Sequence, residues 1–246
     1  MAKKETIPTI IDTPEALTAK MAAMKEAQKI FATYTQEQVD KIFKAAAIAA
    51  NKARIPLAKM AVEETGMGIV EDKVIKNHYA AEYIYNAYKD TKTCGVIEED
   101  KAYGTKKIAE PIGVIGAVIP TTNPNMTVLV NGIYALKGAN VLMFAPHPRA
   151  KISTAHTCEI LEKAIQEMGG PANVFQCVDD PNMELTQMMM SAADTVLGTG
   201  GPGMVKAAYS SGKPAYGVGA GNSQSIFDPE FGDLSGALDR FLMGNT

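Results

Sequence analysis

Residues 110–151 read EPIGVIGAVIPTTNPNMTVLVNGIYALKGANVLMFAPHPRAK and alternate apolar runs with a helical segment. Residues 112–119 form a short, almost continuous apolar run, which is typical of a strand buried on both faces of a parallel sheet. The Asn-Pro pair at 123–124 resembles a helix start, so a helix is expected to run to Lys137. Residues 140–144 then read as a second strand. The stretch therefore predicts a β-α-β unit.

The composition is that of an ordinary globular protein. With 246 residues, of which 46% are hydrophobic and 21% charged, the chain can bury a large core as one large or two small domains. A formal net charge of -3 argues against nucleic acid or an anionic membrane as the main partner. No apolar run approaches the length of a membrane span, and residues 1–14 lack the apolar core of a signal peptide. We therefore expect a cytoplasmic protein without nucleic-acid or membrane partners.

Three cysteines, Cys94, Cys158 and Cys177, stand at wide spacings along the chain. They form neither a disulfide framework nor a zinc motif, as expected in a reducing compartment. The three histidines also lie far apart in the sequence. A structural metal site is therefore not expected.

Residues 1–94 read as a helical part. A Thr-Pro start precedes the first helical pattern, and Thr35 with Gln38 resembles a capping box that opens a second, long helix. Pro56 is expected to kink that helix or to divide it in two. Residues 71–89 predict a further helix with a tyrosine-rich face. That face fits a core or subunit contact better than a base-stacking surface, because no basic cluster accompanies the rings.

Residues 95–109 are expected to form a two-stranded linker. Residues 94–97 and 105–109 read as strands, and residues 98–104 read as the polar turn between them. An exposed hairpin offers unpaired strand edges to another subunit. We therefore expect a homo-oligomer.

Strand and helix patterns continue to alternate beyond residue 151. Helices are expected at 153–168, 182–192 and 204–209, and strands at 174–178, 195–197 and 215–218. Together with the opening unit this gives five strands separated by four helices, for which a parallel, doubly wound α/β sheet is the most economical fold. Residues 110–246 are accordingly assigned to one Rossmann-like domain, a class of fold that commonly binds dinucleotides.

The run Gly198-Thr-Gly-Gly-Pro-Gly203 directly follows the expected fourth strand. It matches G-x-G-x-x-G, whose glycines let a phosphate approach the backbone at a helix N-terminus. In an open α/β sheet the loops after the first and fourth strands are the usual pair at the ligand site. The ribose-binding fingerprint is incomplete, however, because no acidic residue stands about 20 positions further on. A tight turn that needs several glycines is the alternative interpretation.

Four motifs, read together, resemble a known family. EPIGVIGAVIPTTNP, FAPHPRAK, GTGGPGMVKAAYSSGKPA and GVGAGN, in this order and spacing, are similar to the cofactor-binding half of the CoA-acylating aldehyde dehydrogenases, above all to the N-terminal aldehyde dehydrogenase part of the bifunctional acetaldehyde/alcohol dehydrogenases. The resemblance implies NAD as cofactor and a cysteine nucleophile that forms a thiohemiacetal with a small aldehyde. Hydride then passes to the cofactor, and the resulting thioester gives its acyl group to the thiol of coenzyme A, which releases the cysteine.

The resemblance also implies a set of cofactor-binding residues. They are Ile119, Pro120, Thr121, Thr122, Asn123, His147, Thr199, Gly200, Gly201, Pro202, Gly203 and Gly219. General aldehyde dehydrogenases carry in the first of these loops an asparagine that steadies the developing oxyanion. Here the asparagine stands one place later, so Thr122 or Asn123 could hold that position, and Asn123 is the candidate oxyanion donor.

Residues 146–151 follow the second strand, where cofactor choice is normally set. His147 lies where the wider superfamily uses a lysine to hold ribose hydroxyls, and a surface loop histidine is the alternative. Arg149 and Lys151 could meet a phosphate of NADP or coenzyme A, or be merely solvated. No acidic residue stands here to repel a 2′-phosphate, so NADP should be tolerated, although the resemblance favours NAD.

None of the three cysteines matches the family's nucleophile motif. In the family the nucleophile lies further on, in a catalytic domain, and this sequence stops before that region. We therefore expect the NAD(H)-binding portion of a CoA-acylating aldehyde dehydrogenase, truncated and inactive alone. The alternative is a non-catalytic nucleotide-binding or assembly module that acts through its helical face and hairpin.

Overall fold

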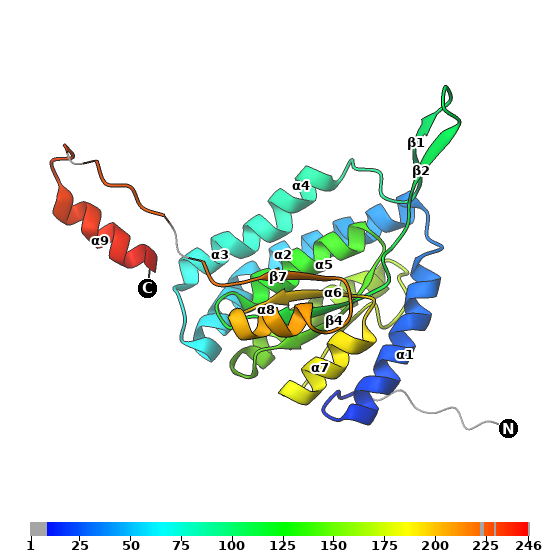
Figure 1. Ribbon diagram of the computed structural model, residues 1–246, viewed down its shortest axis with the longest axis horizontal. Coiled ribbons are helices and arrows are strands. Elements are labelled where there is room, and N and C mark those ends of the chain that lie inside the picture. The colour runs from blue at the N-terminus through cyan, green and yellow to red at the C-terminus, as the bar shows by residue number, and fades with distance from the viewer. Residues whose placement is uncertain (1–8, 222–223, 229, 246) are drawn as a thin grey trace.

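A computed structural model describes residues 9–221, 224–228 and 230–245 (Figure 1). Its N-terminal part is helical, as expected. The elements before the sheet are α1 (Pro14–Phe31), α2 (Gln36–Thr65), α3 (Val70–His78), the π-helical turn η1 (Tyr79–Tyr83) and α4 (Ile84–Tyr88). Strands β1 (Gly95–Asp100) and β2 (Thr105–Ala109) then pair as the predicted antiparallel hairpin, which projects from the body of the molecule (Figure 1).

The rest of the described chain alternates strands and helices. The elements are β3 (Val114–Ile119), α5 (Pro124–Lys137), β4 (Val141–Pro146), the 3-10 helix η2 (Pro148–Ala150), α6 (Lys151–Glu167), β5 (Phe175–Cys177), α7 (Met183–Ala192), β6 (Thr195–Thr199), α8 (Pro202–Tyr209), β7 (Ala215–Val218) and α9 (Leu234–Asn245). In Figure 1, α9 lies apart from the sheet. Among the helices that the structure describes, none has the length and apolar character that a membrane crossing requires.

Strands β3 to β7 form one sheet in the order β5-β4-β3-β6-β7, and every neighbouring pair is parallel. The predicted doubly wound α/β fold is confirmed. The winding direction changes between β3 and β6, which are neighbours in the sheet. The loops after these two strands therefore meet at the sheet's carboxyl edge, where open α/β sheets bind ligands.

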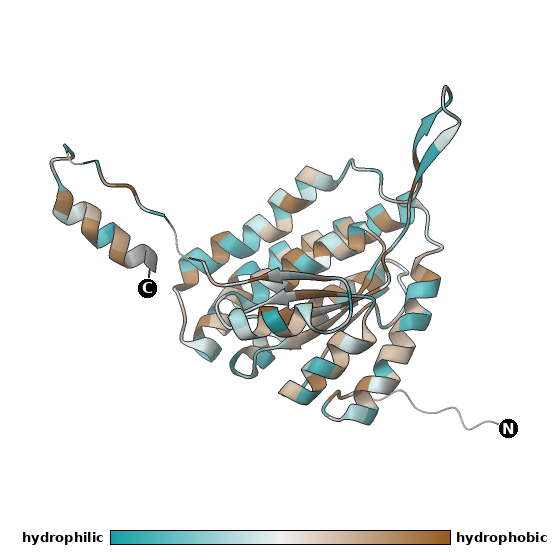
Figure 2. Cartoon of the chain, viewed as in Figure 1, coloured by the Kyte–Doolittle hydropathy of each residue, from teal (hydrophilic) through white to brown (hydrophobic). Residues whose placement is uncertain are grey.

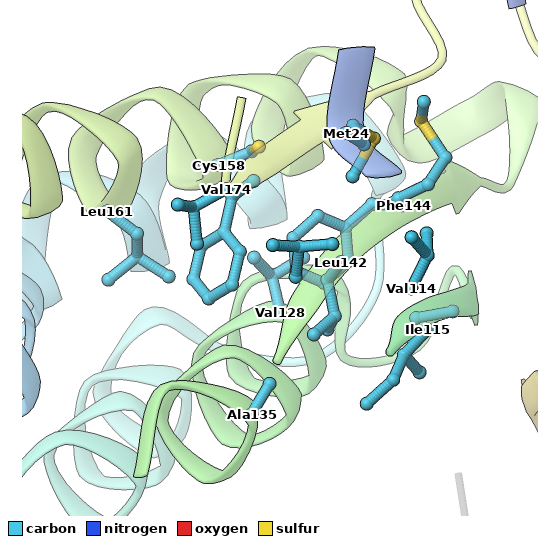
Figure 3. Packing of buried hydrophobic residues seen from close by; sticks show 14 of the residues in the cluster. Met24, Val114, Ile115, Val128, Ala135, Leu142, Phe144, Cys158, Leu161 and Val174 are labelled. Atoms are coloured by element: carbon cyan, nitrogen blue, oxygen red, sulfur yellow. The ribbon is translucent and has the colours of Figure 1, made fainter. Parts of the chain in front are cut away.

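The core lies on both faces of this sheet. Helices α2, α5 and α6 pack together on one face, and α1, α7 and α8 lie on the other (Figure 1). All residues of β3 and β4 are buried, and Figure 2 shows apolar colours along the sheet between helices with polar outer faces. Figure 3 shows Met24 of α1 above Phe144 of β4. The rings of Phe144 and Phe175 meet edge to face, with centroids 5.7 Å apart.

The first strand of the sheet begins at Val114, two residues later than the sequence predicts. Ile112 is 58% exposed, and its N–H and that of Gly113 donate to Asn140 Oδ1 at 2.6 and 3.1 Å. The N–H of Val114 donates to Asp194 Oδ2 at 2.8 Å. Side chains from two later loops thus accept hydrogen bonds from the backbone N–H groups at and just before the start of β3.

Pro56 does not divide its helix, so that alternative is wrong, while the expected kink stays a prediction. α2 is a single helix from Gln36 to Thr65. A proline removes one backbone donor and crowds the preceding turn. Two side chains serve carbonyls in that turn, because Arg54 Nη1 donates to the carbonyl of Asn51 at 2.7 Å and Asn77 Nδ2 donates to that of Arg54 at 3.1 Å. These bonds stabilise the helix around Pro56 and tie α3 to α2.

Three rings of the predicted tyrosine-rich face lie outside the core, whereas Tyr85 packs against the buried Phe43. Tyr79, Tyr83 and Tyr88 are 51, 61 and 40% exposed. The rings of Tyr79 and Tyr83 stack on each other at a centroid distance of 5.6 Å, because the π-helical turn places them on one side. The core interpretation of these three rings is therefore wrong, and a subunit contact remains a prediction.

Candidate functional site

A cavity of about 650 Å³ opens at the carboxyl edge of the sheet. It is lined by the loops that follow β3, β4, β6 and β7, together with the start of α7 and part of the turn between α2 and α3. This is the place where the change in winding direction leaves a crevice. Its volume lies in the range of cavities that hold cofactors and other small molecules.

The loop after β3 forms one wall. Ile119 and Pro120 end the strand, and Thr121 is buried while Thr122 is exposed to the cavity side. The carbonyl of Ile119 accepts a hydrogen bond from the N–H of His147 at 3.0 Å. This bond joins the loop after β3 to the loop after β4, so the two walls are held as one unit.

His147 follows β4 and has a defined tautomer. Its Nδ1 accepts a hydrogen bond from the N–H of Arg149 at 3.2 Å and so caps the 3-10 helix Pro148–Ala150. An imidazole nitrogen that accepts carries no proton, so in the neutral ring Nε2 holds the hydrogen. His147 is thus set up as a donor through Nε2, and both His147 and Arg149 line the cavity.

The glycine-rich loop after β6 forms the opposite wall. Gly201 is the N-cap of α8, and no side chain caps this helix start. Pro202, the first residue of α8, has no N–H, and the N–H of Met204 donates to the carbonyl of Gly201 at 3.0 Å, so the N–H of Gly203 is the group that this helix start offers to an anion. The N–H of Gly200 donates to the carbonyl of Val218 at 3.0 Å, which fixes the loop against the end of β7.

Most of the residues that the sequence nominates meet at this cavity. Its lining includes Ile119, Pro120, Thr121, Thr122, His147, Thr199, Gly200, Gly201 and Gly219. Asn123, Pro202 and Gly203 are not among the lining residues. Asn123 instead turns toward α3, where its Oδ1 accepts a hydrogen bond from Lys76 Nζ at 3.2 Å. Its side chain also does not cap α5, although it occupies the N-cap position.

Sequence reasoning missed several lining residues. They are Met67, Pro181, Asn182, Met183, Thr186 and Met204. The loop after the third predicted strand carries a usable signal, because Asn182 precedes a helix and its Oδ1 accepts from the N–H of Leu185 at 2.9 Å. Met67 comes from the distant turn after α2, and no local pattern indicates that it would reach the sheet.

An acidic residue that is distant in the sequence also lies at the start of α6, just after the loop that follows β4. The carboxylate of Glu64, at the end of α2, accepts from the N–H groups of Ile152 and Ser153 at 2.7 and 2.8 Å. It thereby occupies the N-terminus of α6. Residues 146–151 contain no acid, yet a negative charge stands beside them in space.

The three cysteines lie away from the lining of the cavity. Burial raises the pKa of the Cys158 thiol well above its usual value and raises the pKa of the Cys177 thiol strongly. Burial also raises the pKa of Cys94. A thiol must ionise to act as a nucleophile, so none of these sites favours the reactive form. In the part of the chain that the structure describes, no cluster of His, Cys, Asp and Glu side chains could hold a metal ion.

The sequence matches a known protein family along nearly its whole length. The family model described as "Aldehyde dehydrogenase family" matches residues 2–244. The chain belongs to the aldehyde dehydrogenase family. It is 55% identical over 232 residues to the bifunctional aldehyde-alcohol dehydrogenase AdhE of Escherichia coli strain K12, a match that covers 94% of this chain and 26% of that protein.

Solved structures agree with this assignment. An acetylating aldehyde dehydrogenase from Geobacillus thermoglucosidasius superposes with a TM-score of 0.83 at 45% identity, covering 85% of this chain and 46% of that one. An engineered glycolyl-CoA reductase with bound NADP+ superposes with a TM-score of 0.73 at 32% identity, covering 87% and 48%. The resemblance to the acylating aldehyde dehydrogenases is confirmed. The chain spans about a quarter of its bifunctional relative and just under half of the solved enzymes.

Proposed function

We propose that this chain is the NAD(H)-binding portion of a CoA-acylating aldehyde dehydrogenase, which converts an aldehyde, coenzyme A and NAD into acyl-CoA and NADH. One observation carries the proposal: the loops after β3, β4, β6 and β7 meet around a single cavity. The start of α8, which no side chain caps, offers the N–H of Gly203 and the positive end of the helix dipole to a pyrophosphate. The acetylating relatives and the NADP+-bound neighbour support a nicotinamide cofactor and an acyl-CoA chemistry.

Each wall of the cavity has a proposed role toward the dinucleotide. The glycine loop Gly198 to Gly203 holds the pyrophosphate, and Gly219 and its neighbours close the far side. His147 donates through Nε2 to ribose hydroxyls, as its tautomer allows. The loop from Ile119 to Thr122 lies beside the nicotinamide end. When bound, the cofactor accepts the hydride that the aldehyde carbon gives up.

Asn123 remains the proposed oxyanion donor, and its side chain would have to turn from α3 toward the cavity to donate through Nδ2. Its Oδ1 accepts from Lys76, which leaves the Nδ2 hydrogens as donors. Thr122 is the second candidate, because it lines the cavity and carries a hydroxyl. Coenzyme A and a small aldehyde are the proposed substrates of the complete enzyme, and the cytoplasm is the proposed compartment.

The non-catalytic module remains the second candidate function. Burial raises the pKa of all three cysteine thiols, so none of them is set up as a nucleophile. This observation favours a non-catalytic role for residues 1–246. This second candidate binds a nucleotide or acts in assembly, and like the first it predicts no turnover from residues 1–246 alone. The two differ in whether a reactive cysteine works on the same cavity, which the activity of the polypeptide that includes the downstream reading frame decides.

Cofactor binding and choice provide the first test. Calorimetric titration of the chain with NADH is expected to show saturable binding, and NADPH is expected to bind more weakly but measurably. Arg149 lines the cavity, whereas Glu64 places a carboxylate at the start of α6. Arg149→Glu should therefore weaken NADPH more than NADH, by about tenfold or about 1.4 kcal/mol in the ratio of affinities. Competition with ADP-ribose shows that the heat comes from the dinucleotide site.

Lys151→Glu is the matched control for this ratio. Lys151 is two residues from Arg149, but its Nζ pairs with Asp180 at 2.8 Å and it does not line the cavity. Its replacement should leave the ratio of affinities unchanged. No saturable heat with either nucleotide would contradict the proposed function, and an unchanged ratio in Arg149→Glu would remove Arg149 from the site.

We propose further that the hairpin β1-β2 contributes to a homo-oligomer. Val96 and Ile108 are opposite each other in the ladder and are 40 and 58% exposed, so the projecting hairpin carries an unburied apolar pair. Ile108→Glu is expected to lower the mass measured by sedimentation velocity. Ile30→Glu, at an isoleucine 53% exposed on α1, is the control that should keep the parent mass. A monomeric parent would contradict the oligomer.

A further inference from the structure

Lys73 of α3 is a buried cation behind the loop after β3. The residue is 6% exposed, and its Nζ donates to the carbonyl of Thr122 at 2.8 Å. Thr122 and its neighbour Thr121 line the cavity. A side chain from the N-terminal helical part therefore supports the wall of a site that the sheet builds.

The charge of Lys73 is not balanced by a carboxylate. In the part of the chain that the structure describes, Lys73 forms no ion pair within 4.0 Å. Burial lowers the pKa of its ammonium, and the nearby cation of Lys76 lowers it further. Burying a cation without a counter-charge is costly, and a carbonyl dipole compensates only part of the cost.

Two further bonds fix α3 in place next to this loop. Lys76, one turn along the helix, donates to Asn123 Oδ1 at 3.2 Å. Asn77 is 1% exposed, and its Nδ2 donates to the carbonyl of Arg54 in α2. Asn77 thus holds the helix to α2, while Lys73 and Lys76 hold consecutive residues of the loop.

We propose that Lys73 is the positioning residue of the loop from Ile119 to Asn123. It binds the Thr122 carbonyl and thereby fixes the orientation of that peptide, so that the loop keeps the shape in which Thr121 and Thr122 line the cavity. The identity of the ligand rests on the proposed function, whereas the contact between Lys73 and the loop is independent of it. The helical part is accordingly a component of the dinucleotide site.

Lys73→Met tests this, because methionine keeps an apolar stem and removes the ammonium. Amide hydrogen exchange of residues 119–123, measured without nucleotide, should accelerate by about tenfold when a charged hydrogen bond to the loop is lost. The dissociation constant of NADH should rise by about tenfold. If Lys73→Met does not fold, Lys73→Gln is measured in its place.

Lys20→Met is the matched control. Lys20 is also a buried lysine, 5% exposed, with a pKa lowered by burial, and its Nζ donates to Asn173 Oδ1 far from the cavity. It should lower the melting temperature but leave loop exchange and NADH affinity as in the parent. Parent-like exchange at 119–123 in Lys73→Met would overturn the inference. A parent that fails to bind NADH would overturn the proposed function instead, and loop exchange would still decide the role of Lys73.

Discussion

Gly200→Val is expected to weaken NADH binding by about a hundredfold, or about 2.8 kcal/mol. Gly200 lines the cavity between β6 and α8, and its N–H is already bonded to Val218. A phosphate must approach this backbone closely to reach the N–H of Gly203 at the start of α8. A branched side chain at this position obstructs that approach, and calorimetric titration with NADH measures the loss.

The structure also indicates a second source of obstruction. A Cβ at position 200 would lie 3.1 Å from Met204 Cβ and 3.2 Å from Met204 Cγ, so Met204 would have to shift slightly. Met204 lines the same cavity. Combining Gly200→Val with Met204→Ala removes that contact. If the valine acts on the phosphate, the double variant stays as weak as the single one, and circular dichroism shows an intact fold in both.

Recovery of parent affinity in the double variant would assign the effect to Met204. Parent-like binding by Gly200→Val itself would remove the glycine loop from the site. The single variant is also compared with Gly232→Val, at a glycine outside the cavity where an added Cβ meets nothing within 4 Å. This control should bind NADH as the parent does.

The order of strands and the edge that carries the site follow from local patterns. The buried runs at β3 and β4, the helix starts and the glycine-rich turns are each encoded within a few residues, so their alternation predicts a parallel sheet. The same alternation brings the loops after β3 and β6 together, since the winding reverses between them. These features are predictable because one segment at a time determines them.

The features that the sequence does not predict are contacts between distant segments. Glu64 caps α6 across 88 positions, and Lys73 supports the loop after β3 across 49. The start of β3 depends on Asn140 and Asp194, and the uninterrupted α2 is stabilised by Asn77. Each of these polar side chains looks like an ordinary surface residue in its own segment. Only the tertiary arrangement gives it a partner.

Residues 1–246 by themselves are expected to show no CoA-dependent reduction of NAD with acetaldehyde. Covalent catalysis needs a thiolate within reach of the aldehyde carbon, and losing the nucleophile typically lowers the rate by about 10⁴-fold or more. Cys94, Cys158 and Cys177 do not line the cavity, and burial raises the pKa of each thiol, so little thiolate forms near neutral pH. NADH binding should nevertheless be retained.

The assay compares the parent with a variant in which all three cysteines are replaced by serine. Both are expected to give the same background absorbance at 340 nm and to bind NADH with similar affinity, which separates lost chemistry from lost folding. Cys158 is fully buried behind the sheet, so its replacement is also tested singly for stability. Turnover in the parent that vanishes in the triple variant would place a nucleophile among these cysteines. None of the three thiols lines the cavity in the present arrangement. Such a result would therefore require the cavity to open toward one of these cysteines.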